Sequence, residues 1–524
     1  MTLLATRTDV RAALAEIVGD AHVLTGTAAL PFAGDVYRTL EPPLAVVRPG
    51  SVEELQAVVR ATADTCTPLA VRGGGASYTD GYLSQGSGHV LIDTGRLDRI
   101  VAIDPEAGYV TVQAGVTWAA LREALAAHDL RTPFWGPFSG LAAAIGGSTS
   151  QNSTSHGSGA YGISAESVLS FDVVTADGSL LSTGSAAAGL APFSRHFGPD
   201  LTGLFTGDCG ALGIKARITL PVIRRRAAHR PISFAFPDFA AMHEAMRRVA
   251  QERIEDSHFA LDAALSQGQI ARQDRAGASL AVAWSILKSS PSLAAGVRQL
   301  AHAATSARRV IGTSAFMVHY IVEGFDDAEA RARLHRIRTL TAGLGSEIPA
   351  TVPAVVRGMP FAPLFNTLGP AGERWVPLHG VLPHAAVPGF HVALEAFYAA
   401  RAEAMQAHGV WTGGMFATMG ASGFLYEIAL YWPDAYTAYH EAVIPPDYLA
   451  GLPRHTENPA ARAYVHQLKA DLTALFVAHG AINFQLGKAY PYAGRLGAAP
   501  LALLRAIKAE VDPHGRLSPG NLGL

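Results

Sequence analysis

The sequence predicts an α+β fold built from more than one domain, on three observations. The chain has 524 residues, whereas one domain typically contains roughly 100–200. Residues 1–225 combine short apolar runs with tight-turn signals, but longer amphipathic helices alternate with strands from Pro231 onward. Glycine contributes 53 residues, about a tenth of the chain against a usual share of roughly 7%, and it gathers after strands. The backbone therefore has to approach something closely.

The first part of the chain begins with a βαβ unit. Ser51-Val52-Glu53-Glu54 is a capping box, and the helix that it starts runs to about Asp64 with an apolar face. Apolar runs at 44–47 and 68–71 flank this helix and predict strands.

Two hairpins and a further helix are expected next. Strands are predicted at 90–93, 100–104 and 109–113, and the last two flank a turn. Thr117 caps a helix that reaches His128. A second hairpin joins 171–175 to 180–182, and a strand at 213–221 closes this region.

The sequence pattern changes at Arg224-Arg225-Arg226, and this basic run is interpreted as a solvated linker between domains. The residues that follow are predicted to form one α+β domain. An internal duplication within this domain is left open. Its expected strands lie at 234–236, 281–286, 316–322, 415–418 and 425–432. Its expected helices lie at 239–253, 293–308, 327–342, 390–408 and 434–443, and a longer one follows at 459–479.

Composition excludes several classes of protein. A net charge of −2 argues against a nucleic-acid partner, which would require a basic excess. Two cysteines, Cys66 and Cys209, argue against a disulfide scaffold or a cysteine zinc site. No secretory signal and no membrane span is recognised, so a cytoplasmic location is expected. The P-loop, G-x-S-x-G and H-E-x-x-H spellings do not occur, and no G-x-G-x-x-G opens a helix after a strand as in a Rossmann fold.

Three segments of small residues predict a bound ligand of extended shape. The first is the run Gly73-Gly74-Gly75 after a strand, where successive N–H groups can form a nest for a pyrophosphate. The second covers residues 137–149 and the third covers residues 207–214. Their even spacing suggests one ligand that runs along all three.

These segments, in this order, resemble the FAD-dependent oxidoreductases of the vanillyl-alcohol oxidase/p-cresol methylhydroxylase (PCMH) superfamily, which also holds D-lactate dehydrogenases and berberine-bridge-type enzymes. Residues 43–49, together with the helix that Ser51 starts, resemble the motif at the beginning of the family's FAD domain. Residues 71–78 resemble the loop that binds the pyrophosphate. Residues 144–147 and 207–214 resemble its later FAD-contacting segments, and 512–520 its C-terminal D-P-x-G motif.

The resemblance implies a bipartite PCMH-type FAD-binding domain of two α+β subdomains, covered by a large α+β cap. The N-terminal part would be 1–225, the cap 226–469, and residues 470–524 would complete the FAD domain and active site. FAD is the implied cofactor. The residues implied to contact it are Arg72, Gly73, Gly74, Gly75, Ala76, Ser77, Tyr78, Pro137, Gly140, Ala143, Gly146, Gly147, Thr149, Gly213 and Ile214.

Departures from the family bear on how FAD is attached. Many members link FAD to a histidine in the first loop, where this chain has Ala76. The second loop lacks the cysteine of the berberine-bridge enzymes. Linkage at either place is excluded, whereas a tether from the cap stays open.

The substrate is less well defined. The tyrosine–arginine pair of the phenol oxidases is replaced by Tyr490-Pro491, and their second-loop acid by Ser150. The D-2-hydroxy-acid dehydrogenases bind a metal through histidines of the cap, and His379 and His384 are the candidates for such ligands here. Histidines of this kind more often form hydrogen bonds within the core or act as acid–base groups, so no metal is predicted. Lys488 resembles a lysine of the sugar oxidases that stabilises reduced flavin.

The expected function is an FAD-dependent oxidase or dehydrogenase that transfers hydride from a small alcohol, aryl alcohol or hydroxy acid to flavin N5. Candidate catalytic residues are Tyr490, Lys488, His379 and Tyr426. The alternatives are an oxidative cyclase of the berberine-bridge type and a flavin-storage protein. The expected partners are a small-molecule substrate and O₂ or another electron acceptor, and a homo-oligomer stays open.

Overall fold

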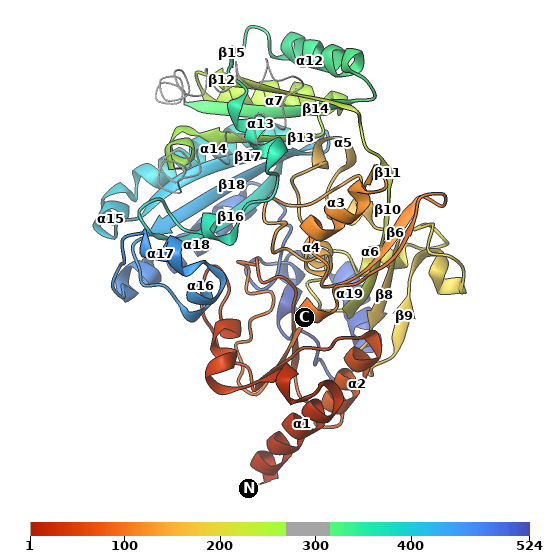
Figure 1. Ribbon diagram of the computed structural model, residues 1–524. Helices are drawn as coiled ribbons and strands as arrows, with labels where there is room; N and C mark the ends of the chain where they lie inside the picture. Colours follow the sequence, from red (N-terminus) through yellow and green to blue (C-terminus); the bar gives the residue numbers. More distant parts are fainter. Residues whose placement is uncertain (1, 269–314) are drawn as a thin grey trace.

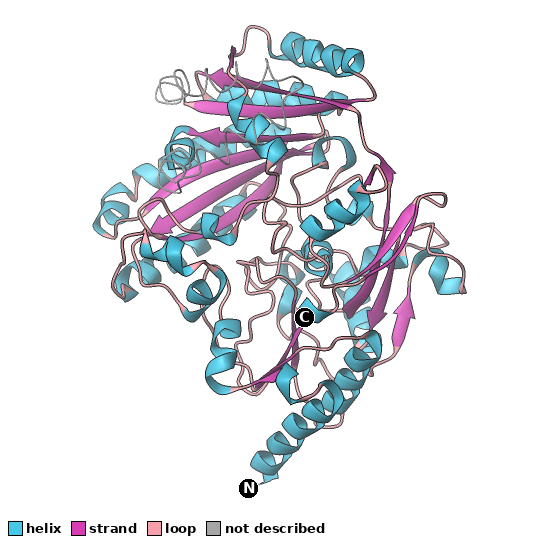
Figure 2. Ribbon diagram, viewed as in Figure 1, coloured by secondary structure: helices cyan, strands magenta, loops and turns pink. Residues whose placement is uncertain are grey.

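The structure is a computed structural model that describes residues 2–268 and 315–524. Figure 1 shows a large sheet with its helices in one half of the molecule and smaller sheets in the other. The mixture of helices and sheets confirms the α+β prediction (Figure 2). The strand expected at 281–286 and the helix expected at 293–308 lie outside the described residues.

The βαβ prediction is confirmed in a four-stranded sheet of order β1-β2-β4-β3, in which β2, β4 and β3 are parallel. Helix α2 begins at Ser51, whose Oγ accepts the Glu54 N–H at 3.1 Å. The Glu54 carboxylate turns back one residue further than a capping box requires, to the Gly50 N–H at 2.7 Å. The bounds are β1 (Val23–Leu24), β2 (Ala45–Val47), α2 (Val52–Ala63), β3 (Leu69–Arg72) and β4 (Val90–Asp93).

A second, five-stranded antiparallel sheet has the order β5-β6-β10-β8-β9. The two hairpins predicted from the sequence are the pairs β5–β6 and β8–β9, so both are confirmed. Helix α3 packs its apolar side on this sheet through Trp118, Leu121 and Leu125. The bounds are β5 (Ile100–Asp104), β6 (Tyr109–Gln113), α3 (Trp118–Ala126), α4 (Ile145–Gln151), β8 (Ser170–Val174), β9 (Leu180–Ser182) and β10 (Ile214–Pro221).

Strands between residues 228 and 432 form an antiparallel seven-stranded sheet of order β15-β12-β14-β13-β17-β18-β16, which is called the cap sheet below. Strand β16 was not predicted from the sequence, because Pro377 and Gly380 interrupt its apolar pattern. The bounds are β12 (Ala228–Phe236), β13 (Ser257–Asp262), β14 (Phe316–Gly324), β15 (Ser346–Ile348), β16 (Arg374–Pro383), β17 (Trp411–Met419) and β18 (Gly423–Trp432).

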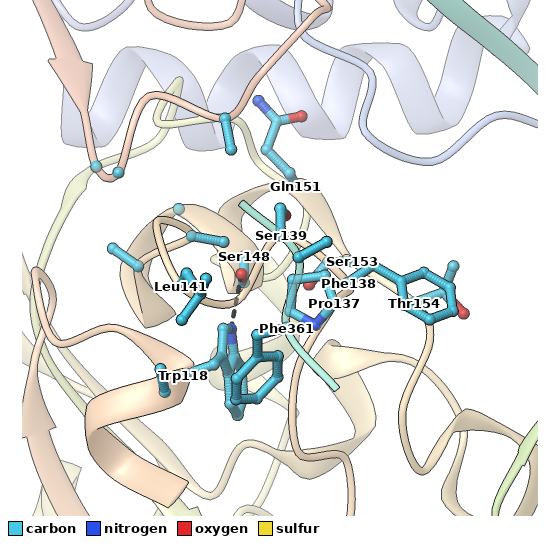
Figure 3. Close-up of a pocket in the computed structure, with 18 of the residues that line it drawn as sticks. Trp118, Pro137, Phe138, Ser139, Leu141, Ser148, Gln151, Ser153, Thr154 and Phe361 are labelled. Carbon is cyan, nitrogen blue, oxygen red and sulfur yellow. Dashed lines mark hydrogen bonds between the residues drawn. The ribbon is translucent and has the colours of Figure 1, made fainter. Parts of the chain in front are cut away.

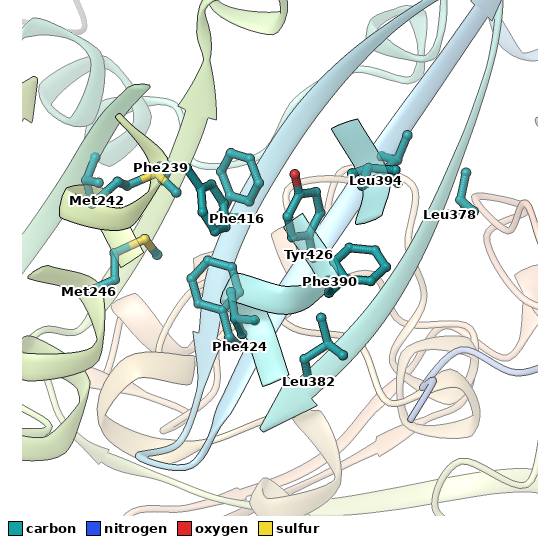
Figure 4. Packing of buried hydrophobic residues seen from close by; sticks show 14 of the residues in the cluster. Phe239, Met242, Met246, Leu378, Leu382, Phe390, Leu394, Phe416, Phe424 and Tyr426 are labelled. Atoms are coloured by element: carbon teal, nitrogen blue, oxygen red, sulfur yellow. The ribbon is translucent and has the colours of Figure 1, made fainter. Parts of the chain in front are cut away.

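Helices α7, α12, α14 and α18 pack on one face of this sheet and form the largest core with it (Figure 4). The helix predicted at 390–408 is two helices that break near Arg401, and the one predicted from Asp434 begins at Ala438. The bounds are α7 (Phe239–Glu252), α12 (Asp327–Thr341), α13 (Thr351–Gly358), α14 (Val387–Ala399), α15 (Ala402–Ala407), α16 (Ala438–Val443) and α18 (Pro459–Ala478).

The C-terminal segment touches both halves. The Leu69 N–H donates to the Arg516 carbonyl at 2.8 Å, which places residues after α19 beside β3. The Val381 N–H donates to the Ile482 carbonyl at 2.8 Å, which ties the same segment to the cap sheet. The remaining bounds are α1 (Thr2–Val18), β7 (Leu130–Arg131), α5 (Ser158–Tyr161), α6 (Leu201–Leu204), β11 (Ile223–Arg224), α17 (Pro446–Ala450) and α19 (Ala498–Val511). Among all described helices, none has the length and apolarity to cross a bilayer.

Candidate functional site

A cavity of about 1500 Å³ lies between the glycine-rich loops and the cap sheet. Its walls come from the loop after β3, the loop that leads into α4, the start of β10, helix α13 and the sheet strands β13, β17 and β18. Pockets for one small ligand measure roughly 300–1,000 Å³. The cavity therefore has room for a dinucleotide and a substrate beside it.

The loop after β3 presents unpaired backbone donors to the cavity. Within the described residues, the N–H groups of Gly74, Gly75, Ala76 and Ser77 donate to no protein acceptor. A Cβ built on Gly74 would lie 1.6 Å from the Ala142 carbonyl oxygen, so only glycine fits here. Free N–H groups at a side-chain-free loop suit a ligand with anionic oxygens.

The second loop is shown in Figure 3, where Pro137, Phe138, Ser139 and Leu141 follow one another along the cavity. Its helix is held against α3, because Trp118 Nε1–H donates to Ser148 Oγ at 2.8 Å. A Cβ on Gly147 would meet no protein atom within 4 Å. At Gly147 the wall of the cavity therefore consists of backbone atoms with free space in front of them.

Most of the residues predicted to bind the cofactor line this one cavity, and three do not. Arg72 turns to Asp93, 3.4 Å away, and to the rings of Phe32 and Tyr82. Gly140 lies under the Phe361 ring, and the Thr149 hydroxyl donates to the Ile145 carbonyl at 2.9 Å. The residues that do line the cavity are Gly73, Gly74, Gly75, Ala76, Ser77, Tyr78, Pro137, Ala143, Gly146, Gly147, Gly213 and Ile214.

Strand β18 has two faces, and they differ in what they meet. Glu427, Ala429 and Tyr431 line the cavity. Tyr426 lies on the opposite face, where its ring packs against Phe390 and Phe416 in the core (Figure 4). Because side chains alternate along a strand, Tyr426 cannot share a face with Glu427. The structure thus places the candidate Tyr426 away from the cavity.

His379 and Tyr490 lie together directly behind the cavity wall. The Tyr490 hydroxyl is 3.3 Å from His379 Nδ1 and accepts the His379 backbone N–H at 2.9 Å. His379 Nε2–H donates to the Phe484 carbonyl at 2.7 Å. Burial lowers the pKa of His379 to about 4, so the ring is neutral at neutral pH. Neither side chain lines the cavity.

Lys488 is also absent from the wall. Its ammonium donates to the carbonyl of Leu83 at 2.8 Å and to Asn521 Oδ1 at 2.6 Å. These acceptors hold the lysine among the C-terminal turns, and burial lowers its pKa to about 8. The candidate His384 lies on the helix side of the sheet, where its Nδ1 is 3.0 Å from His243 Nε2. Across the described chain, no three His, Cys, Asp or Glu side chains gather at metal-binding distances.

The polar groups of the cavity beside the cap sheet include Glu427, Gln485 and Tyr78, and the cations of the wall are Arg122, Arg131, Lys215, Arg225 and Arg357. The Tyr78 hydroxyl donates to Gln485 Oε1 at 2.5 Å, and its ring lies edge-on to Trp375 with centroids 5.8 Å apart. The alternation of the sequence around 426–431 was the available signal for Glu427. Alternation puts neighbouring side chains on opposite faces of the strand, but it does not decide which face meets the cavity.

Comparison with known proteins agrees with this geometry. Residues 43–184 match the family model described as "FAD binding domain". The chain carries an FAD-binding domain. The predicted cofactor, FAD, is confirmed with it.

Curated relatives share this part of the chain. The glycolate oxidase subunit GlcD of Escherichia coli (strain K12) is 32% identical over 235 residues, 44% of this chain and 45% of that protein. The probable mitochondrial D-lactate dehydrogenase of Danio rerio is 32% identical over 208 residues, 39% of this chain and 40% of that protein. The chain thus spans less than half the length of these relatives.

Solved structures resemble almost the whole chain. p-Cresol methylhydroxylase with substrate bound has a TM-score of 0.70 at 17% identity, covering 99% of this chain and 97% of that one. Alkyldihydroxyacetonephosphate synthase has a TM-score of 0.67 at 16% identity, covering 98% of this chain and 84% of that one. The PCMH-type fold predicted from the sequence is confirmed.

Proposed function

We propose that this protein is an FAD-dependent oxidoreductase that acts on CH–OH donors. The single observation that carries the proposal is the continuous cavity, which joins the glycine-rich loops to a polar cluster beside the cap sheet. FAD, when bound, supplies the acceptor for the substrate hydride. The chain itself would supply the binding groups, the walls of the cavity and the proton acceptor.

The residues of the cavity fit FAD. The free N–H groups of Gly74 to Ser77 suit its diphosphate, because they offer donors without side chains in the way. The backbone around Gly147 leaves room for a flat molecule, and Gly213 and Ile214 extend the same wall. Residues 1–225 with 470–524 would hold FAD, and residues 226–469 would cover the substrate.

FAD is expected to be held without a covalent bond. Among the described residues of the wall there is no histidine, and burial raises the pKa of Cys209 to about 12, which keeps its thiol protonated. We expect the purified protein to be yellow and to release its flavin when precipitated with acid, as measured by flavin absorbance in the supernatant. Colour that stays in the pellet would contradict this and would point to a tyrosine of the wall.

The reaction class is tested by anaerobic reduction of the bound flavin. Aryl alcohols, 2-hydroxy acids and sugars are added to the purified protein, and the loss of flavin colour is followed. Bleaching by one alcohol class supports an oxidoreductase on CH–OH donors. A protein that purifies without flavin, or whose flavin no CH–OH donor reduces, would overturn the proposal. Reoxidation in air then separates an oxidase from a dehydrogenase that needs another acceptor.

A further inference from the structure

We propose that Glu427 is the catalytic proton acceptor of this site, and that the substrate is an apolar alcohol with no carboxylate next to its hydroxyl-bearing carbon. This inference rests on the proposed function and adds the substrate class to it.

The position of Glu427 is set by the cap sheet. It pairs with Met415 of β17 and with His379 of β16 in the strand register, so these three side chains share one face. Met415 and Glu427 reach the cavity, whereas His379 is covered by Phe484, whose ring centroid lies 4.2 Å from its own. Glu427 is half-buried, and within the described residues no hydrogen bond or ion pair engages its carboxyl group.

Four neutral side chains lie near Glu427. Tyr78 comes from the loop after β3, His379 from β16, and Gln485 and Tyr490 from the C-terminal segment. Behind them, the ammonium of Lys469 lies 5.9 Å from the centroid of the Tyr490 ring. Burial without a compensating cation raises the pKa of Glu427 to about 7. A carboxylate with such a pKa can take up a proton near neutral pH.

The proton balance of the reaction assigns a role to this carboxylate. When an alcohol is oxidised, the carbinol C–H bond breaks and its hydrogen leaves with the electron pair to FAD. The O–H bond breaks as well, and its proton goes to the Glu427 carboxylate, which becomes a carboxylic acid. The C–O single bond becomes a carbonyl. No additional oxidant or reductant is required.

The same geometry discriminates against 2-hydroxy acids. In such a molecule the carboxylate is bonded to the carbinol carbon, so placing the hydroxyl on Glu427 brings two carboxylates together in a low-dielectric site. In the part of the chain that the structure describes, no cation forms an ion pair with Glu427 to offset their repulsion. Of the cations that line the cavity, Arg131 and Arg357 pair with Asp256 and Glu323, and Lys215 pairs with Asp208. The walls around Glu427 are apolar and favour an uncharged hydrocarbon or aromatic body; they include Phe259, Leu261, Val356, Trp375, Met415 and Tyr431.

The test uses two unreactive ligands of equal shape. 2-Phenyl-2-propanol and 2-hydroxy-2-phenylpropanoate lack a carbinol C–H, and they differ only by a methyl in place of a carboxylate. Their dissociation constants are measured at pH 6 and pH 8.5 from the change in flavin absorbance. At pH 8.5 we expect the wild-type protein to bind the alcohol at least 10-fold more tightly than the acid. Equal or tighter binding of the acid would overturn the proposal.

Substitution separates the charge of Glu427 from its shape. Glu427→Gln is expected to strengthen binding of the acid at pH 8.5 by about 10-fold and to remove its pH dependence, with FAD retained. Its kcat/KM for a reactive alcohol is expected to fall by roughly 10²–10⁴-fold, with loss of the ionisation near pH 7. Glu395→Gln on α14 makes the same charge change outside the cavity and is expected to change neither quantity.

The outcomes distinguish a failure of the role proposed for Glu427 from a failure of the proposed oxidoreductase function. If Glu427→Gln retains FAD but leaves both the ligand preference and the pH profile unchanged, Glu427 is not the proton acceptor, and the proposed oxidoreductase function still stands. If the wild-type protein holds no flavin, the proposed function itself fails.

Discussion

Gly74→Ala is expected to abolish FAD binding and to destabilise the protein. The new Cβ would lie 1.6 Å from the Ala142 carbonyl oxygen and 3.1 Å from the Ala144 nitrogen, so the backbone of the second loop would have to move. Overpacking of this kind costs about 1–3 kcal/mol, and a backbone neighbour places the cost at the upper end. Flavin content after purification and the midpoint of urea unfolding measure the two effects.

Gly147→Ala is the matched control in the second loop. Its Cβ meets no protein atom within 4 Å, and alanine is favoured over glycine in a helix by roughly 1 kcal/mol. The FAD-free form of this variant is therefore expected to be at least as stable as the wild type, while its affinity for FAD falls, because the methyl group projects into the cavity. A Gly74→Ala protein with full flavin content and unchanged stability would contradict the assignment of these loops.

Arg131→Met is expected to lower the free energy of unfolding by about 3–5 kcal/mol. The Arg131 guanidinium lies 2.8 Å from Asp256 and 2.6 Å from Glu323, and it also donates to the Pro133 carbonyl at 2.8 Å. Its removal leaves two buried carboxylates, from β14 and the turn before β13, with Arg357 as their remaining cation. Since Arg131 precedes the second loop, the same change is expected to loosen the cap over the cavity.

Arg336→Met provides the comparison for that measurement. Arg336 also pairs with a carboxylate, that of Glu252, but its side chain is 51% exposed. Exposed ion pairs contribute about 0–1 kcal/mol. Chemical denaturation of both variants checks the difference. A loss for Arg131→Met no larger than that for Arg336→Met would show that the buried network does not hold the two halves together.

Local patterns in the sequence predicted the parts of the protein whose cause is local. Ser51 caps its helix because its hydroxyl meets an N–H three residues away, and the β5–β6 hairpin follows from the turn between its strands. The run Gly73–Gly75 indicates a close backbone approach, since no other residue type would leave that space. These features need no knowledge of distant residues.

The catalytic candidates depended on contacts between distant segments. The motif around Lys488 predicts that this lysine contacts the flavin. In the structure its ammonium instead donates hydrogen bonds to the Leu83 carbonyl and to Asn521 Oδ1. His379 and Tyr490 are 111 residues apart in sequence and bond to one another behind the wall. No local pattern contains such partners.

Strand β18 shows most clearly what the sequence determines and what the tertiary structure decides. Alternation at 426–431 determines that Tyr426 and Glu427 point to opposite faces, because successive side chains of a strand do so. Which of them meets the cavity depends on the face that helices α7, α14 and α18 cover. These helices bury Tyr426 in the largest core and leave Glu427 on the open face. The sequence thus indicated the glycine-rich loops, and the packing of these helices on the cap sheet decided that Glu427, and not Tyr426, lines the cavity.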